Sequence, residues 1–402
     1  MKVNPWTLGL AAAGLVTLPA ATQAEEKLNP LLTAVTPTSL SGAVSTSIHW
    51  NPGTGNAFSS PRLYQQGKAD GFNLDVVSLT LDKPLDESQW AAGYHVDLWF
   101  GPDANTFASQ SSGTTADLAI KQAYVALRTP FGNGLEWKVG VFDSVIGYES
   151  HDSSKDPNYS RSYATSIEPH THTGVLGSYQ FSPSFGMSFG IADTDGPRIN
   201  SRANPPKAES FKTYMASLAV TAPDDWGFVS GSTLYSGFVN GFNNGWNGSQ
   251  FNYYAGVTLN TPVKKLKVGT SFDYATITDD AYQPPPPGSS QPELNAWALT
   301  GYASYELTEK LSGHFRIEYT ETDANIYGTG ARLEDGKSRL FGMTGTLQYD
   351  LWANVISRLE FIWDHQAGDN TMIPFGGQPE RGETHGSKRD AFTIALNLIY
   401  KF

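Results

Sequence analysis

The sequence contains no cysteine, and only 16% of its 402 residues are charged. A chain without cysteine forms no disulfides and offers no thiolate to a metal. The charged fraction is well below the quarter, roughly, that is typical of soluble domains. Basic residues are also few, at 27 against 39 acidic ones, and the net charge of −12 argues against nucleic acid as a partner.

Long apolar runs are missing after the N-terminal segment, so the sequence predicts no transmembrane helix there. At the start, Lys2 precedes an apolar run over residues 8–18 and small residues at Thr22 and Ala24. This order predicts a signal peptide over residues 1–24, followed by a periplasmic segment over 25–38. An exported chain that is rich in strands and lacks a spanning helix is typical of the Gram-negative outer membrane.

The clearest strand pattern lies at the end of the chain, over residues 389–402. Apolar side chains alternate there with small or polar ones, and they are Phe392, Ile394, Leu396, Leu398, Tyr400 and Phe402. This face is aromatic at both ends, as in a transmembrane barrel strand that crosses lipid between two aromatic girdles. The final strand of a soluble β-sandwich is the alternative interpretation of this segment taken alone.

Similar alternation recurs along the chain and predicts about sixteen strands of roughly ten residues, long enough to cross a membrane when tilted. The predicted strands are 39–50, 73–82, 89–101, 117–129, 134–147, 171–182, 184–195, 210–222, 226–240, 249–261, 264–278, 293–307, 310–321, 339–350, 354–365 and 389–402. Short and long connections alternate strictly between them, which favours a barrel over a sandwich.

The predicted fold is therefore all-β: a transmembrane up-and-down antiparallel β-barrel over residues 39–402, with short periplasmic turns and long external loops. A barrel of about this size is too wide for its own side chains to fill and leaves an aqueous channel. The sequence thus indicates passive diffusion through a pore, without a cofactor.

Several short motifs around the third long connection resemble one known family. Residues 147–149 read GYE, 158–163 read NYSRSY, and 168–174 read EPHTHTG; upstream, 121–126 read KQAYVA and 129–134 read TPFGNG. These motifs resemble the OmpL-like β-barrel porin family over roughly residues 117–180. The resemblance implies an outer-membrane barrel of the porin type and implies no particular substrate.

The third long connection, residues 148–170, corresponds by strand count to the loop that narrows the pore of general porins. We hypothesise that its charged residues lie in the lumen opposite a charged barrel wall. The loop residues are Glu149, Asp152, Asp156, Arg161 and Glu168, and the wall residues are Lys138, Lys265, Lys267, Arg316, Glu318, Arg358 and Glu360. Such opposed charges sort solutes by charge. The alternative is that Arg161 and Glu168 only hold the loop to the wall through buried pairs, and both roles can coexist.

Other functions have weaker support in the sequence. His170 and His172 could bind a metal with Glu168, but two histidines without a closed ligand set are more typical of hydrogen bonding, so we predict no metal. A surface adhesin that works through its external loops is the alternative to a porin, and an outer-membrane enzyme is a third class.

The predicted partners follow from the predicted location. They are outer-membrane lipid, small hydrophilic solutes, the barrel-assembly machinery through the strand that ends at Phe402, and further copies of the chain in a homotrimer.

Overall fold

The computed structural model describes residues 38–56, 62, 68–107, 109, 117–193, 195–196, 198–202, 212–243, 248–278, 294–323, 337–368, 374–377 and 386–402. Within this part of the chain, no helix is long and apolar enough to cross a membrane. The predicted signal peptide lies outside the described residues, as does the segment after it up to residue 37.

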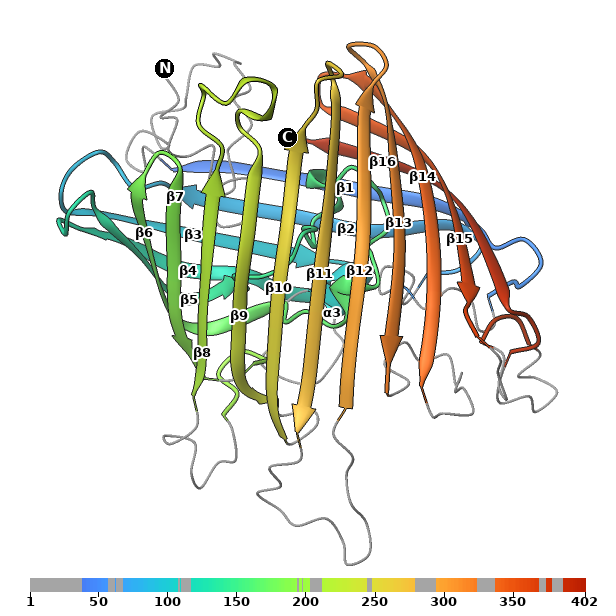
Figure 1. The fold of residues 1–402 in the computed structure, drawn as a ribbon, viewed down its shortest axis with the longest axis horizontal. Coiled ribbons are helices and arrows are strands. Elements are labelled where there is room, and N and C mark those ends of the chain that lie inside the picture. Colours follow the sequence, from blue (N-terminus) through green and yellow to red (C-terminus); the bar gives the residue numbers. More distant parts are fainter. Residues whose placement is uncertain are drawn as a thin grey trace, which may run out of the picture.

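The sheet is a closed barrel in which each strand pairs antiparallel with its neighbours in sequence, and β16 pairs with β1. In Figure 1, β8 to β13 stand side by side in one wall and β1 to β5 cross them in the opposite wall. The strands are β1 (Ser39–Trp50), β2 (Gly71–Lys83), β3 (Ala91–Phe100), β4 (Leu118–Thr129), β5 (Leu135–Asp143), β6 (Thr171–Ser182), β7 (Phe185–Ala192), β8 (Thr213–Thr221), β9 (Thr233–Asn243), β10 (Gly248–Asn260), β11 (Leu266–Thr278), β12 (Leu294–Glu306), β13 (Leu311–Thr322), β14 (Ser338–Trp352), β15 (Val355–Gln366) and β16 (Asp390–Lys401). The predicted up-and-down barrel of about sixteen strands is confirmed.

Alternation along each strand separates a lipid-facing side from an inner side. On β13, Phe315 and Ile317 are 40% and 39% exposed, whereas Arg316 and Glu318 are 0% and 1% exposed. Apolar residues thus face outwards and charged residues face inwards, the reverse of a soluble sandwich. Large exposed aromatics gather at the short turns, as expected for an interfacial girdle; they include Trp90, Phe131, Trp226 and Trp352.

Among the local differences from the predicted elements, three are the largest. β5 ends at Asp143 instead of residue 147, so the residues that follow it leave the wall. β9 begins at Thr233 instead of residue 226, because Gly227–Val229 forms a 3₁₀ helix, η5, ahead of it. A short helix, α3 (Pro102–Phe107), occupies the connection after β3, where alternation gives no signal for a helix.

Two glycines on neighbouring strands lie where the adjacent backbone leaves no room for a Cβ atom. Gly140 on β5 lies opposite Gly174 on β6. A Cβ atom on Gly174 would lie 2.1 Å from the backbone oxygen of Ile191, a distance that real side chains do not tolerate. Gly345 on β14 differs, because a Cβ atom there would meet nothing within 4 Å.

We expect Gly174→Ala to destabilise the barrel by about 1–3 kcal/mol through this overpacking. The matched control Gly345→Ala should leave stability unchanged, because its methyl group points into open space. The measurement is the urea midpoint at which the heat-modifiable folded band on a gel disappears. Equal midpoints for the two variants would contradict the packing described for β6 and β7.

Candidate functional site

The third long loop, residues 148–170, is the centre of the candidate site because it contacts the inner face of the barrel at several strands. Between the end of β5 and this loop, Val145 and Ile146 pack into an apolar cluster with inward residues of β6, β8 and β9. The ring of Tyr148 then stacks on Tyr302 of β12 with centroids 4.2 Å apart, and its hydroxyl lies 2.8 Å from the Thr258 hydroxyl. The loop therefore reaches strands far from β5 and β6, which it connects.

Two buried carboxylates of the wall hold the middle of the loop by its backbone. Glu360 on β15 accepts the amides of Tyr159 and Ser160 at 2.7 and 2.9 Å. Glu318 on β13 accepts the amide of Tyr163 at 2.5 Å. Hydrogen bonds from amides to carboxylates are stronger than those between neutral groups, so these contacts fix the backbone against β13 and β15.

Two arginines of the wall hold the same stretch through its acceptors. Arg316 donates to the Glu149 carboxylate at 2.8 Å and to the Ser160 carbonyl at 2.9 Å. Arg358 donates to the carbonyls of Ser153 and Asp156 at 2.7 and 2.5 Å. The wall therefore contributes both charge signs, while the loop contributes the Glu149 carboxylate and backbone groups, which differs from an acidic loop opposite a basic wall.

Arg161 binds the loop to itself. Its guanidinium donates to the carbonyls of Ser150 at 3.0 Å and Tyr159 at 2.5 Å, and also to that of His151. The Asp156 carboxylate lies 3.6 Å from its Nε, and burial raises the pKa of Asp156 above its usual range. The Arg161 side chain thus shapes the loop, whereas its backbone carbonyl accepts from Arg316 of the wall at 3.1 Å.

The remaining predicted residues lie apart from this centre. Asp152 caps the 3₁₀ helix Ser153–Lys155, η2, by accepting from the Ser154 amide. Lys138 lies over the Tyr124 ring at 4.8 Å on the inner side of β5. Lys267 shares the inner face of β11 with Asp273 and is exposed, whereas Lys265 lies in the turn before β11 with a positive φ.

Sequence reasoning missed a second loop that contributes to the site. Arg62, from the first long connection, donates to Glu318 and to Asp364 of β15, both at 2.6 Å. Its guanidinium also lies over the Tyr163 ring, with Cζ 4.4 Å from the ring centroid. The pattern on β15 does place Asp364 on the polar face, but one arginine in a loop carries no positional signal.

A second missed group fixes the loop against β1 and β2. The Tyr159 hydroxyl donates to Asp75 at 2.8 Å, and Ser47 donates to the same carboxylate at 2.7 Å. Lys68 lies 3.1 Å from Asp75 and 2.8 Å from Asp103 of α3. Contacts from β1, β2, β13 and β15 thus converge on residues 159–163.

The histidines of the loop do not assemble a metal site in the described residues. His151 and His170 lie with ring centroids 4.4 Å apart, and His172 lies 3.2 Å from the Ser144 hydroxyl. Burial and the adjacent Lys121 hold the pKa of His151 well below its usual range. Within the same residues, no group of three or more histidine, aspartate or glutamate side chains is placed to hold an ion.

The contacts of two histidines on strands, His95 and His314, can be compared with those of a hydrolytic site. His95 bonds Asp82 at 2.9 Å, and the two nitrogens of His314 lie 2.9 and 3.0 Å from the hydroxyls of Ser304 and Ser312. Neither of these contacts links a serine to a carboxylate through one imidazole, as a hydrolytic triad requires.

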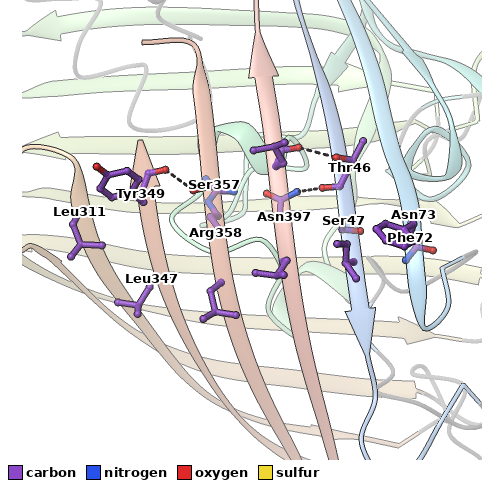
Figure 2. A pocket seen from close by; sticks show the side chains of 14 residues that line it. Thr46, Ser47, Phe72, Asn73, Leu311, Leu347, Tyr349, Ser357, Arg358 and Asn397 are labelled. Atoms are coloured by element: carbon purple, nitrogen blue, oxygen red, sulfur yellow. Dashed lines mark hydrogen bonds between the residues drawn. The ribbon is translucent and has the colours of Figure 1, made fainter. Parts of the chain in front are cut away.

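A hollow of about 680 Å³ lies on the lipid-facing side of the barrel, across β1, β2 and β13 to β16. Figure 2 shows Phe72, Leu311, Leu347 and Tyr349 around it. Because its lining is largely the outward apolar face, this hollow lies outside the lumen.

Comparison with known families decides the classification. The family model described as "Putative beta-barrel porin-2, OmpL-like" matches residues 37–402. The chain belongs to this family. The resemblance seen in the motifs of residues 117–180 is confirmed, and the family is one of outer-membrane barrels, which gives the location of the chain.

Solved outer-membrane proteins share the fold at low identity. The channel DcaP of Acinetobacter baumannii is 11% identical with a TM-score of 0.58, over 91% of this chain and 97% of that one. The trimer form of OmpT from Vibrio cholerae is 13% identical with a TM-score of 0.55, over 91% and 99%. An anion-selective porin from Comamonas acidovorans is 11% identical with a TM-score of 0.55, over 91% and 99%. Sequence comparison with curated proteins finds no match.

We expect Arg316→Met to release the loop while the barrel remains folded. The change leaves the Glu149 and Glu318 carboxylates buried without this cation, at a cost of about 3–5 kcal/mol. The measurement is the rate of tryptic cleavage after Lys155 and Arg161 in folded protein. Arg339→Met is the control, because Arg339 pairs with Glu321 away from the loop; equal cleavage in both variants would contradict the role of Arg316.

Proposed function

We propose that the protein is a porin that lets small hydrophilic solutes or ions diffuse passively through the barrel, with residues 148–170 as the constriction. The observation that carries the proposal is the attachment of this loop to inward carboxylates of β13 and β15, Glu318 and Glu360. A loop held there occupies part of the cross-section that a barrel of about sixteen strands would leave to water.

The distribution of charge inside the barrel supports passage of solutes with little charge preference. Most inward charges lie on β2 to β4 and β13 to β16, and those that contact the loop are neutralised locally, as in the pairs of Arg62 and Arg316 with Glu318. The inner face of β7 to β9 carries neutral side chains instead, both polar ones such as Ser188, Thr213 and Ser217 and apolar ones such as Met215 and Val239. Paired charges give a weak field in the pore, so neither ion sign is strongly favoured.

Deletion of residues 150–166 should raise the single-channel conductance in planar bilayers severalfold, because it removes the backbone that fills the lumen. Arg339→Met, which keeps the loop attached to Glu318 and Glu360, is the control and should leave conductance near the native value. Reversal potentials in a salt gradient would report charge preference in the same experiment. Unchanged conductance and selectivity after the deletion would remove the constriction role, and absence of solute flux into liposomes would favour an adhesin.

A homotrimer is the assembly that we propose. Several outward side chains of β2 to β4 are aliphatic, as at Leu81, Val125 and Leu127, although Phe72 on β2 is also exposed; those of β7 to β16 include many exposed aromatics. A smooth aliphatic sector suits contact with a second barrel better than an aromatic one, which suits the lipid interface. The trimer form of the V. cholerae protein shows that one barrel of this fold assembles in this way.

Val125→Lys should dissociate this trimer, because it places a charge in the aliphatic sector. Leu347→Lys is the matched control: Leu347 on β14 is 51% exposed against 50% for Val125, so both lysines carry a similar lipid-burial penalty. Native mass spectrometry in detergent gives the stoichiometry. A native protein that is monomeric, or a trimer that survives Val125→Lys, would contradict the assignment of this sector.

We also propose that the barrel-assembly machinery recognises β16 through its last residue. Phe402 exchanges two backbone hydrogen bonds with Gly42 of β1, at 2.9 and 3.0 Å, at the seam where the sheet closes. In this proposal, the folding partner binds the edge of β16 before that edge pairs with β1.

A further inference from the structure

Four consecutive strands of the barrel carry no charge. β7 to β10 contain no lysine, arginine, aspartate or glutamate over their whole lengths. The next two strands carry three charged residues between them, Lys267 and Asp273 on β11 and Glu306 on β12. One side of the interior is therefore electrically neutral, in contrast to the wall at β13 and β15 to which the loop is attached.

Tyrosine rings lie on this neutral side. Tyr148 of the third long loop stacks on Tyr302 of β12 with centroids 4.2 Å apart and the ring planes 13° from parallel. Tyr235 of β9 packs against the same apolar cluster as Tyr148. Tyr302 lies opposite Arg316 in the register of β12 and β13, and so it points inwards. All three tyrosines are partly exposed, and what they expose faces the interior of the barrel.

Two glycines of the wall make room for the central ring. Tyr235 lies opposite Gly256 of β10, and Gly269 of β11 lies opposite Tyr302. Tyr148 occupies the space above both glycines: a Cβ atom on Gly269 would overlap its hydroxyl, and one on Gly256 would lie 3.2 Å from its Cδ2. The three tyrosines thus form a band across β9 to β12, strands that stand side by side in Figure 1. We call them the tyrosine band.

Hydroxyl groups border the tyrosine band on the side of the short turns. The Thr258 hydroxyl lies 2.8 Å from that of Tyr148. On β12 and β13, the hydroxyls of Ser304 and Ser312 lie 2.9 and 3.0 Å from the two nitrogens of His314. These four bordering side chains are partly exposed. A hydroxyl donates one hydrogen bond and accepts two, so each of these groups has capacity for a further partner.

The charged residues nearest to the band do not face it. Lys267 lies opposite Ser304 in the register of β11 and β12, and Glu306 follows two residues later, so both lie beyond the hydroxyls at the end of their strands. Asp273 is 2% exposed, and Glu168 of the loop, which the sequence predicted to face the lumen, is 8% exposed. A solute on the tyrosine band therefore meets aromatic faces and neutral hydrogen-bonding groups.

This combination matches the chemistry of a carbohydrate. A sugar ring has one or two faces of C–H groups and a rim of hydroxyls. The C–H faces stack on the electron-rich face of an aromatic ring, and the hydroxyls bond to neutral donors and acceptors at its edge. A charged solute in the same place would lose water without gaining a partner of opposite charge.

We propose that the tyrosine band, Tyr148, Tyr235 and Tyr302, is a subsite for uncharged carbohydrates that pass the constriction loop. The proposal names the solute class of the proposed porin, and its role in transport rests on that function. A few stacked rings bind weakly, which suits a pore, because a solute must leave its site as readily as it enters.

Binding is first tested in detergent, without reference to transport. The probe is a linear glucose trisaccharide, observed by saturation-transfer NMR with the purified full chain. Saturation should reach the ring C–H protons of the trisaccharide. Sorbitol is the matched control, since it has the hydroxyls of a sugar but no ring to stack, and it should receive no saturation. Equal transfer to both probes, or none to the trisaccharide, would overturn the proposal.

Substitutions then separate the aromatic face from the rest of the side chain. Tyr302→Leu should weaken trisaccharide binding about fivefold, the effect of losing one aromatic stack, whereas Tyr302→Phe should keep it. Gly269→Ala should weaken binding similarly, because its methyl group displaces Tyr148 while every ring remains. Tyr305→Leu is the control on the outward face of the same strand, where Tyr305 is 41% exposed.

Each variant is compared with the native protein only after its folded band on a gel is confirmed. If Tyr302→Leu does not fold, Tyr235→Leu replaces it at the other end of the band, with Tyr235→Phe as its conservative partner. Equal affinities for the Leu and Phe variants would refute stacking. A loss in Tyr305→Leu as large as in Tyr302→Leu would refute the location.

Ion current in planar bilayers distinguishes this proposal from the porin function. The trisaccharide should interrupt the current through native channels, with interruptions about fivefold shorter in Tyr302→Leu. Binding in detergent without any conductance would uphold the subsite and refute the porin, whereas conductance without sugar binding would refute the subsite alone. If a carboxylated trisaccharide binds more tightly than the neutral one and Lys267→Gln removes the gain, the assignment to uncharged sugars fails.

Discussion

Closure of the sheet between β1 and β16 is the constraint on which the rest of the structure depends. A strand in lipid has no water to satisfy its backbone, so every edge must be paired, and the two terminal strands pair from Ala43 with Lys401 to Trp50 with Ile394. Closing a sheet of this size fixes a lumen wider than the inward side chains can span. Whatever narrows the lumen must therefore come from a connection between strands, and residues 148–170 contact the inner wall at β2, β12, β13 and β15.

The loop contacts charged side chains that are buried inside the barrel. Each of these charges is neutralised by its own set of ion pairs and hydrogen bonds. Glu318 shows this best, since its carboxylate receives Arg62 from one loop, Arg316 from the wall and the amide of Tyr163 from another loop. Removing any one donor leaves the carboxylate buried and undercompensated, which costs more than the pair itself contributes. The two long loops and the wall therefore depend on one another for their positions, although they are far apart in sequence.

The sequence predicts the barrel well and its interior only in part, for a physical reason. Side-chain alternation on β13 and β16 follows from the two-residue period of a strand, so the strands, their faces and the order of long and short connections can be derived locally. The inward position of four wall residues could be predicted, because charged and apolar residues alternate along β13 and β15. These residues are Arg316, Glu318, Arg358 and Glu360. The loop residues that they bind could not be predicted, because side chains in a loop do not alternate with a fixed period. Arg62 looks like any solvated loop arginine, and Arg161 turns back on its own loop.

The C-terminal limb of the loop is held by a different kind of contact from the middle. Beside the middle of the loop, buried carboxylates of the described interior meet an arginine, a lysine or backbone amides, as Glu149, Asp75 and Glu360 do. At β11 and β12 the limb packs instead on the small side chains of Ala275, Ala296 and Ala298. Apolar packing therefore fixes this limb, whereas ion pairs and hydrogen bonds to charged groups fix the middle of the loop.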